Sequence, residues 1–368
     1  MEAGHGQHRE GENAISSGRS GGQPPEPPGG PPPAPPSGPS RRGRGLLIGG
    51  AIVFGLLFLM VGIIALVLIA GYGRQGGGSA VAPETFDEEY VSGQGADKIA
   101  VLPVVGTIGS QQSLPLSTPA ATPTALRNQL RQAAEDRSVK AVVLEINSPG
   151  GSVVASDQMH ESIREFKQTT NKPVVVSMGE TAASGGYYIA TAADKVVANE
   201  STLTGSLGVI FSYLNFAEAA DKLGLKEEVV KSGKFKDIGS PTREPTEEEL
   251  EILQSLIDES YDGFVKVIVE GRGLPEDQVR KLADGRVYSG LQAKSLGLVD
   301  ELGDLDRAAE LSGELAGVRG ATVVRYKRSL DLLGLLQSRL APSEPDALKV
   351  LETAGLSPTP ELQYLYRP

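Results

Sequence analysis

Hydrophobic and polar positions divide the chain into an unpatterned start, one long apolar run and a long region of short alternating segments. Residues 1–45 show no hydrophobic periodicity and are rich in Gly, Pro and Ser, which predicts a disordered tail. Residues 46–70 contain no charged residue. A helix rising about 1.5 Å per residue over such a run crosses a hydrocarbon core of about 30 Å. We therefore predict a transmembrane helix at 46–72, followed by a linker at 73–96.

From residue 97 to residue 328, β-branched runs alternate with segments of helical periodicity. This alternation is typical of an α/β layered fold with a largely parallel sheet. The longest predicted helix starts at Thr246, where Glu249 completes a capping box, and runs to about residue 270. Residues 329–368 form a C-terminal extension. The predicted strands are 99–108, 140–146, 173–178, 195–198, 208–214, 227–231 and 321–326, and the other main predicted helices are 123–136, 153–166, 187–193 and 215–223.

The charges beside the apolar run predict its orientation. Arg41, Arg42 and Arg44 precede it closely, whereas only Arg74 follows closely. The positive-inside bias then places the N-terminus in the cytoplasm and the folded domain outside the cell membrane. The alternative is a cleaved signal peptide, for which residues 80–82 offer a small-residue cleavage site. The run is longer than the usual apolar segment of a signal peptide, which favours an uncleaved single-pass protein.

Composition narrows the chemistry. The chain of 368 residues has no Cys, so thiolate nucleophiles, disulfides, zinc fingers and iron–sulfur clusters are excluded. Its formal net charge of −11 argues against a nucleic-acid partner. We predict no cofactor and no metal site.

Ser184 is the candidate nucleophile. It stands among Ala and Gly residues after a predicted strand and before a predicted helix, so another backbone can approach it closely. The first amides of a helix also favour a developing negative charge. The alternative is a packing turn of small residues, because the Gly-x-Ser-x-Gly nucleophile elbow is not present.

A nucleophilic serine needs a base. His5 and His8 lie in the tail across the membrane, and His160 sits mid-helix, where we interpret it as a structural or solvated residue. The remaining candidates include the lysines of a Gly-punctuated loop, since burial can make a lysine amine neutral. Spacing alone does not choose among these lysines, which are Lys231, Lys234 and Lys236.

The glycine turn at Gly150 and Gly151 is the candidate oxyanion hole, because its amides are free to point at a ligand. It follows the buried strand 140–146 and precedes a helix, as Ser184 does after the next strand. Both turns should lie at the same edge of a parallel sheet, where ligands bind in open α/β folds. The alternative is a turn without a catalytic role.

Taken together, these residues resemble the signal peptide peptidases of serine peptidase family S49, in the short bacterial form with one catalytic domain behind an N-terminal membrane helix. The motifs that carry the resemblance are 147–151, 177–179, 182–188, 203–209, 231–233, 236–237, 284–288 and 298–300.

The resemblance implies a Ser/Lys dyad in a ClpP/crotonase-like layered fold. Ser184 matches the nucleophile, Lys236 the general base and Ser206 a serine that hydrogen-bonds the lysine. Gly151 matches an oxyanion amide donor, with Gly150 beside it. The family also implies a ring-shaped homo-oligomer, expected to be an octamer, with dyads formed between neighbouring subunits. Lys234, two residues before the expected base, is a competing lysine.

The function expected from the resemblance is that of a serine endopeptidase, a hydrolase that degrades cleaved signal peptides and other short apolar peptides at the membrane. Two alternatives remain at this point. An acyl-CoA hydratase or isomerase on the same fold would not need Ser184, and a membrane scaffold would have no catalysis. A separate hypothesis concerns residues 362–368, an apolar terminus that either binds in a substrate groove as an added strand or forms a free end or an oligomer contact.

Overall fold

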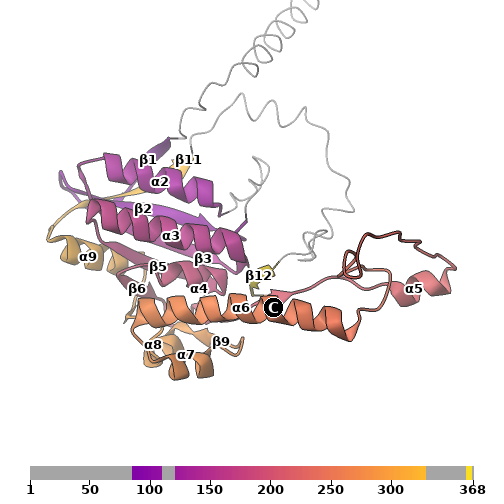
Figure 1. The fold of residues 1–368 in the computed structure, drawn as a ribbon. Coiled ribbons are helices and arrows are strands. Elements are labelled where there is room, and N and C mark those ends of the chain that lie inside the picture. Colours follow the sequence, from indigo (N-terminus) through magenta and orange to yellow (C-terminus); the bar gives the residue numbers. More distant parts are fainter. Residues whose placement is uncertain (1–84, 110–120, 329–361, 367–368) are drawn as a thin grey trace, which may run out of the picture. The chain divides into compact units, whose positions relative to one another are not determined.

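The computed structural model describes residues 85–109, 121–328 and 362–366, all within one compact unit, Ala82–Pro368 (Figure 1). The described residues form an α/β layered fold around a mostly parallel sheet, as the alternation predicted. The order of its main path is β1-β11-β2-β3-β5-β6-β10, and β7 and β9 continue from β5. These strands are β1 (Phe86–Ser92), β2 (Lys98–Val105), β3 (Val139–Ser148), β5 (Val174–Ala183), β6 (Lys195–Ala198), β7 (Leu203–Gly205), β9 (Val287–Ser289), β10 (Glu301–Leu302) and β11 (Thr322–Arg328).

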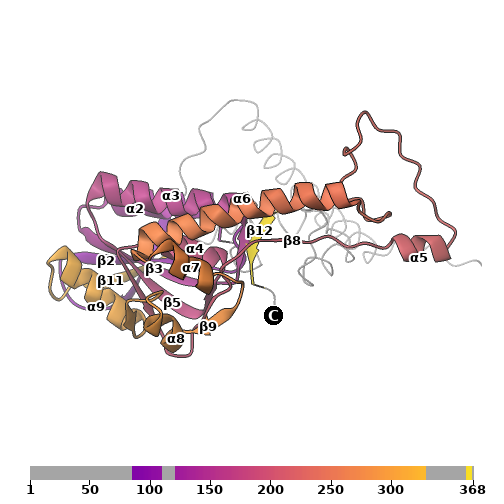
Figure 2. The same ribbon diagram turned by 60° about the horizontal axis from the view of Figure 1, so that its bottom comes forward.

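The central strand β3 shows why the sheet is covered on both faces. Its Val142, Leu144 and Ile146 belong to one buried cluster, and its Ala141 and Val143 belong to another. Successive side chains of a strand point to opposite faces, so both faces of the sheet are apolar. Figure 2 shows α2, α3 and α6 on one side and α9 on the other. The helices are α2 (Pro123–Glu135), α3 (Val153–Thr170), α4 (Gly185–Ala190), α5 (Ala217–Lys222), α6 (Glu247–Arg272), α7 (Glu276–Leu282), α8 (Gly290–Ser295) and α9 (Leu305–Ala316).

The predicted capping box of α6 is confirmed. The Thr246 hydroxyl accepts from the Glu249 amide, and the Glu249 carboxylate accepts from the Thr246 amide. Gly273, in the left-handed conformation at φ 63°, ends the helix. The C-terminal half buries Phe264, Val265 and Ile268 against the core, whereas the apolar residues of the N-terminal half are partly exposed.

A second, smaller sheet forms beside the carboxyl ends of the main strands. Its order is β4-β12-β8, and β12 runs antiparallel to both neighbours. The three strands are β4 (Gly150–Ser152), β8 (Ile210–Phe211) and β12 (Leu362–Leu365). The C-terminal extension therefore returns to the folded domain as the central strand of this sheet.

Several sequence expectations need correction. The stretch 227–231 is not a strand, because all its residues are exposed and no described strand lies beside it to satisfy its backbone. Its β-branched pair, Val229 and Val230, gave a misleading signal. The strand expected at 208–214 is limited to β8. Conversely, β1 lies inside the predicted linker, where it pairs with β11 from Phe86 to Ser92.

In the part of the chain that the structure describes, no helix is both long and apolar enough to cross a membrane. The predicted transmembrane helix at 46–72 and the predicted tail at 1–45 lie outside the described residues.

Candidate active site

Two turns meet at the carboxyl ends of β3 and β5. These strands are adjacent and parallel, with Ser148 opposite Ala182. The glycine turn that follows β3 and the Ser184 turn that follows β5 therefore lie at the same edge of the sheet, as the sequence predicted. The structure thus brings Ser184, Gly150 and Gly151 together.

Ser184 occupies a sharp strand-to-helix turn. It is the N-cap of α4, with φ 52° and ψ −115°, and its amide donates to the Gly205 carbonyl over 2.8 Å. Its side chain does not cap the helix. The residue is 1% exposed, and Oγ is buried without a hydrogen-bond partner among the described residues. Buried hydroxyls are normally paired, so an orphaned one at a turn of this shape indicates that its partner comes from elsewhere.

Only glycine fits at positions 150 and 151, because other backbone segments pass very close to them. A Cβ on Gly150 would lie 2.6 Å from the Gly185 amide nitrogen, and one on Gly151 would lie 1.9 Å from the Ile108 carbonyl oxygen. The Gly150 amide donates to Ser148 Oγ over 3.1 Å. The amide left for a ligand in this turn is therefore that of Gly151, which faces Tyr364 of β12 in the strand register.

Ser206 lies beside Ser184 on the neighbouring strand. In the parallel pairing of β5 with β7, Ala183 is opposite Gly205, so the next residue of each strand is a serine. Both serines have positive φ, at 52° and 50°, and the Ser206 amide donates to the Arg286 carbonyl over 2.7 Å. Ser206 also lines a cavity of about 400 Å³ together with Tyr261 and Leu365.

The lysine loop is not in contact with Ser184. Residues 212–246 form an arm that includes α5, and no residue of this arm is buried. Both views show α5 apart from the layered part of the molecule (Figures 1 and 2). Lys236 lies on this arm and is exposed. The structure therefore does not bring the expected nucleophile and the expected base together within one chain.

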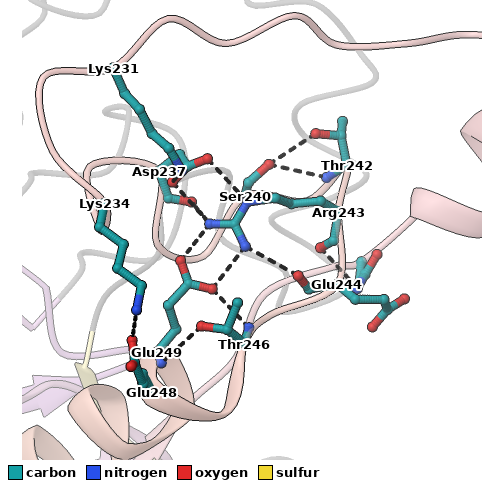
Figure 3. A network of polar contacts seen from close by, with 11 residues as sticks. Lys231, Lys234, Asp237, Ser240, Thr242, Arg243, Glu244, Thr246, Glu248 and Glu249 are labelled. Carbon is teal, nitrogen blue, oxygen red and sulfur yellow. Dashed lines mark hydrogen bonds and ion pairs between the residues drawn. The ribbon is translucent and has the colours of Figure 1, made fainter.

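The three lysines of the arm differ in their partners. Lys231 Nζ lies 2.6 Å from Asp237 Oδ1, and Lys234 pairs with Glu248 (Figure 3). These two amines are each engaged by a carboxylate of their own chain. Lys236 makes no ion pair or hydrogen bond through its side chain within the described residues. Among these lysines it is thus the one whose amine is not engaged by a carboxylate in the described part of the chain.

Arg243 ties the arm to the start of α6. Figure 3 shows its guanidinium between Asp237 and Glu249, with Nη2 2.9 Å from Asp237 Oδ1 and Nη1 2.8 Å from Glu249 Oε2. Its hydrogen bonds lower the pKa of Glu249 to about 2 and hold the pKa of Asp237 well below its usual range. The residue next to Lys236 is therefore a fixed anion anchored to a helix end.

His160 is a core residue of α3, so it is not the solvated residue that the sequence analysis also allowed. It is 6% exposed, and its ring meets Tyr188 edge-on at 5.3 Å between centroids. Burial, helped by nearby Arg164, lowers its pKa to about 4. A histidine held neutral by burial against an aromatic ring has a structural role, which agrees with its earlier interpretation.

An aromatic cluster close to Ser184 was not anticipated from the sequence. Tyr188, four residues after Ser184, and Phe264 of α6 enclose the side chain of Tyr364. The apolar C-terminus was the available signal. The added strand of that hypothesis is present as β12, whereas its place in a substrate groove stays a prediction. Phe264 comes from α6, which is distant in sequence.

Comparisons with known proteins concern the family of the chain. The model of peptidase family S49 matches residues 166–319, and a model of Clp protease matches residues 93–203. A provisionally named signal peptide peptidase SppA of Enterococcus faecium is 36% identical over 302 residues, which cover 79% of this chain and 86% of that protein.

Longer relatives match over a smaller share of their length. Protease 4 of Haemophilus influenzae is 38% identical over 62% of this chain and 36% of its own. The chloroplastic serine protease SPPA of Arabidopsis thaliana is 37% identical over 64% of this chain and 35% of its own. Among solved structures, a ClpP1 mutant of Listeria monocytogenes aligns with a TM-score of 0.37 and 20% identity, covering 57% of this chain and 94% of that one.

Proposed function

The chain belongs to peptidase family S49 and is a serine-type peptidase, and from this premise we propose a membrane-anchored endopeptidase with a Ser184/Lys236 dyad. Its substrates are cleaved signal peptides and other short apolar peptides. The naming of the relatives as peptidases favours this function over an acyl-CoA hydratase or isomerase and over a silent scaffold.

The observation that carries the proposal is the buried, unpaired Oγ of Ser184 beside a glycine turn. Ser184 Oγ attacks the substrate carbonyl, and the negative charge that develops on the carbonyl oxygen meets backbone amides at this edge of the sheet. The Gly151 amide and the first amide of α4, that of Gly185, are the donors. A side chain at Gly150 would block this approach, because its Cβ would lie 2.6 Å from the Gly185 amide nitrogen.

Lys236 supplies the base from a neighbouring copy of the chain. Support comes from the exposed arm, which carries apolar side chains without cover in the single chain, including Leu223, Leu225 and Val230. Docking of this arm on a second copy buries those side chains and the lysine together. Burial disfavours the charged amine, so the docked lysine becomes neutral and able to accept the Ser184 proton. Ser206, beside Ser184, orients the amine. In a closed ring, such as an octamer, every site receives its lysine from the neighbouring copy.

Anchoring rests on the apolar run at 46–72 and its arginine flank. The N-terminal tail is cytoplasmic, and the catalytic domain is extracytoplasmic. Protease added to intact spheroplasts should digest the chain beyond residue 73 and spare residues 1–45. Protection of the catalytic domain would reverse the orientation without touching the catalytic proposal.

The test of the catalytic proposal is labelling of the purified full chain with a fluorophosphonate probe, alongside hydrolysis of an apolar peptide. Labelling should map to Ser184 and disappear in Ser184→Ala, together with hydrolysis. Peptide hydrolysis that persists in Ser184→Ala would remove the serine from the mechanism.

A further inference from the structure

Two hydrogen bonds hold Gly150, the first residue of the glycine turn beside Ser184. The Ile108 amide donates to the Gly150 carbonyl over 2.8 Å, and the Gly150 amide donates to Ser148 Oγ over 3.1 Å. The first bond comes from a main-chain segment that adjoins the turn as an isolated bridge. The second depends on a side chain, the hydroxyl of the residue that ends β3. The two bonds therefore hold the two peptide groups on either side of Gly150.

The bond to Ile108 sets the direction of the Gly151 amide. In a trans peptide the carbonyl and the following N–H point in opposite directions. Because the Gly150 carbonyl faces Ile108, the Gly151 N–H is turned away from Ile108. The Ser152 amide donates to the Ile108 carbonyl over 2.9 Å, so this side of the turn is held at two points. The Gly151 amide is the donor that the proposed function assigns to the oxyanion.

The other peptide group, between Pro149 and Gly150, is held by Ser148. Gly150 is buried and has φ 98°, a conformation that glycine adopts readily and other residues do not. A glycine backbone has the freedom to rotate, and a buried amide without a partner is costly. Without the Ser148 hydroxyl, the turn would therefore gain by rotating Gly150 toward another acceptor. Such a rotation would also redirect the neighbouring Gly151 amide.

The surroundings of Ser148 keep its hydroxyl in place. The residue is 0% exposed. A Cβ on Gly186 would lie 2.9 Å from the Ser148 carbonyl oxygen and 3.5 Å from its Cβ, so Ser148 is packed against the first turn of α4. The glycine turn touches the same helix, because a Cβ on Gly185 would lie 3.2 Å from the Gly150 Cα. Ser148 thus lies where β3, the glycine turn and the helix that follows Ser184 meet.

We propose that Ser148 is a positioning residue of the oxyanion hole. Its hydroxyl engages the Gly150 amide and so keeps the Gly151 amide directed at the carbonyl oxygen of the substrate. The effect belongs to the transition state, because a developing oxyanion needs a donor already in place more than the neutral substrate carbonyl does. This inference rests on the proposed function for the roles of Ser184 and Gly151, but the hydrogen bond it describes does not require catalysis.

The kinetic test compares Ser148→Ala with a matched control, Ser312→Ala, in the full chain. Ser312 is also 0% exposed, and its Oγ donates to the Ala309 carbonyl over 2.8 Å. It lies in α9, on the other side of the sheet from α3 (Figure 2). The control therefore removes a buried hydroxyl of the same kind away from the site.

We expect Ser148→Ala to lower kcat for an apolar peptide about ten- to hundredfold, somewhat less than the loss of an oxyanion donor outright. The KM should change by less than about twofold, because ground-state binding does not use the redirected amide. Ser312→Ala should leave both constants unchanged. A wild-type kcat in Ser148→Ala, or a loss confined to KM, would overturn the inference.

Amide hydrogen exchange, followed by mass spectrometry on peptides covering residues 147–152, gives a second readout. Exchange in this segment should be faster in Ser148→Ala than in the wild type, and unchanged in Ser312→Ala. Wild-type exchange in Ser148→Ala would show that Ser148 does not hold the turn. If Ser184 reacts with the fluorophosphonate probe and Ser148→Ala keeps its kcat, the proposed function stands and the positioning role falls. If Ser184→Ala retains hydrolysis, the proposed function falls, and exchange still decides whether Ser148 holds the turn.

Discussion

At the scale of single residues, the side-chain contacts of the candidate bases distinguish them better than their positions in the sequence do. Lys231 and Lys234 are each held by a carboxylate, whereas Lys236 makes no such contact within the described part of the chain. His160 is buried against Tyr188 and does not reach Ser184 Oγ, which has no described hydrogen-bond partner. The proposal therefore assigns to Lys236 the approach to Ser184 of another chain.

We expect Lys236→Ala to lower kcat/KM for an apolar peptide by at least about a thousandfold, since a Ser/Lys pair acts as a unit. Lys234→Ala, two residues away, should retain most activity, because its amine is engaged by Glu248. Steady-state hydrolysis by the two purified variants decides between them. An inactive Lys234→Ala beside an active Lys236→Ala would move the base to residue 234.

His160 should make the folded chain sensitive to mild acid. Burial lowers its folded pKa to about 4, from the ordinary value of 6.5. Between these values the unfolded chain binds the extra proton, so stability is complete above pH 6.5 and falls as pH drops toward 4. The loss is about 3 kcal/mol at most. Urea unfolding of wild type and His160→Phe at pH 7 and pH 4.5 should show a smaller loss in the variant. Equal losses would show that His160 does not titrate in this window.

At the scale of elements, the site is assembled where strands end. Neighbouring parallel strands bring the two turns to one edge, which the spacing of the sequence already indicated. The Lys236 loop is different, because it is held by a polar network on the start of α6 rather than by a sheet. Arg243 connects Asp237, next to Lys236, with the capping carboxylate of Glu249 (Figure 3).

Arg243→Gln should therefore free the loop 231–246. We expect faster trypsin cleavage within the loop and a lower kcat/KM, with little change in overall unfolding. Arg280→Gln, which removes an exposed arginine pairing with Asp262 and Glu276, is the matched control and should leave both measurements unchanged. Because the pKa of Glu249 is lowered to about 2, the network should persist as the pH falls from neutral and be lost as the pH falls through about 2. If trypsin cleaves the loop of Arg243→Gln at the wild-type rate, contacts other than those of Arg243 hold the loop on α6.

Sequence patterns predicted the elements whose neighbours are local, and missed those whose partners are distant. The strand ends, Ser184 and the α6 capping box follow from short-range patterns. By contrast, the sequence of β1 resembles a linker because many of its residues are polar and face solvent. It forms a strand only by pairing with β11, more than two hundred residues later in the chain. The false strand at 227–231 has β-branched residues but no described neighbour to pair with. The aromatic cluster of Tyr188, Phe264 and Tyr364 includes a residue of α6, which the spacing around Ser184 does not reveal.

At the scale of the whole molecule, the single chain holds an incomplete site. Ser184, Ser206 and the glycine turn are assembled in one chain, and the expected base stands exposed on an arm with uncovered apolar residues. This is the pattern expected when a neighbouring copy completes each site. The proposal of a ring follows from that need for a donor at every site.

Co-expression of Ser184→Ala with Lys236→Ala tests the shared site. If the lysine comes from a neighbour, random mixing in a ring leaves about one quarter of the sites with both groups intact. The mixture should then show about one quarter of wild-type peptide hydrolysis, although each variant alone is inactive. A mixture as inactive as its components would place both groups of the dyad in the same chain.

The backbone of Ser184 has a thermodynamic consequence. At φ 52° and ψ −115° the residue occupies a region that suits glycine, and such strain costs about 1–3 kcal/mol. Glycine relieves the strain, and the greater entropy it gives the unfolded chain offsets about 0.5–1 kcal/mol of that gain. Ser184→Gly should therefore be about 1 kcal/mol more stable toward urea than Ser184→Ala, which keeps the strain, although both are inactive. Selection for stability alone would replace this serine, and the proposed mechanism, which needs its hydroxyl, accounts for its presence at a strained position.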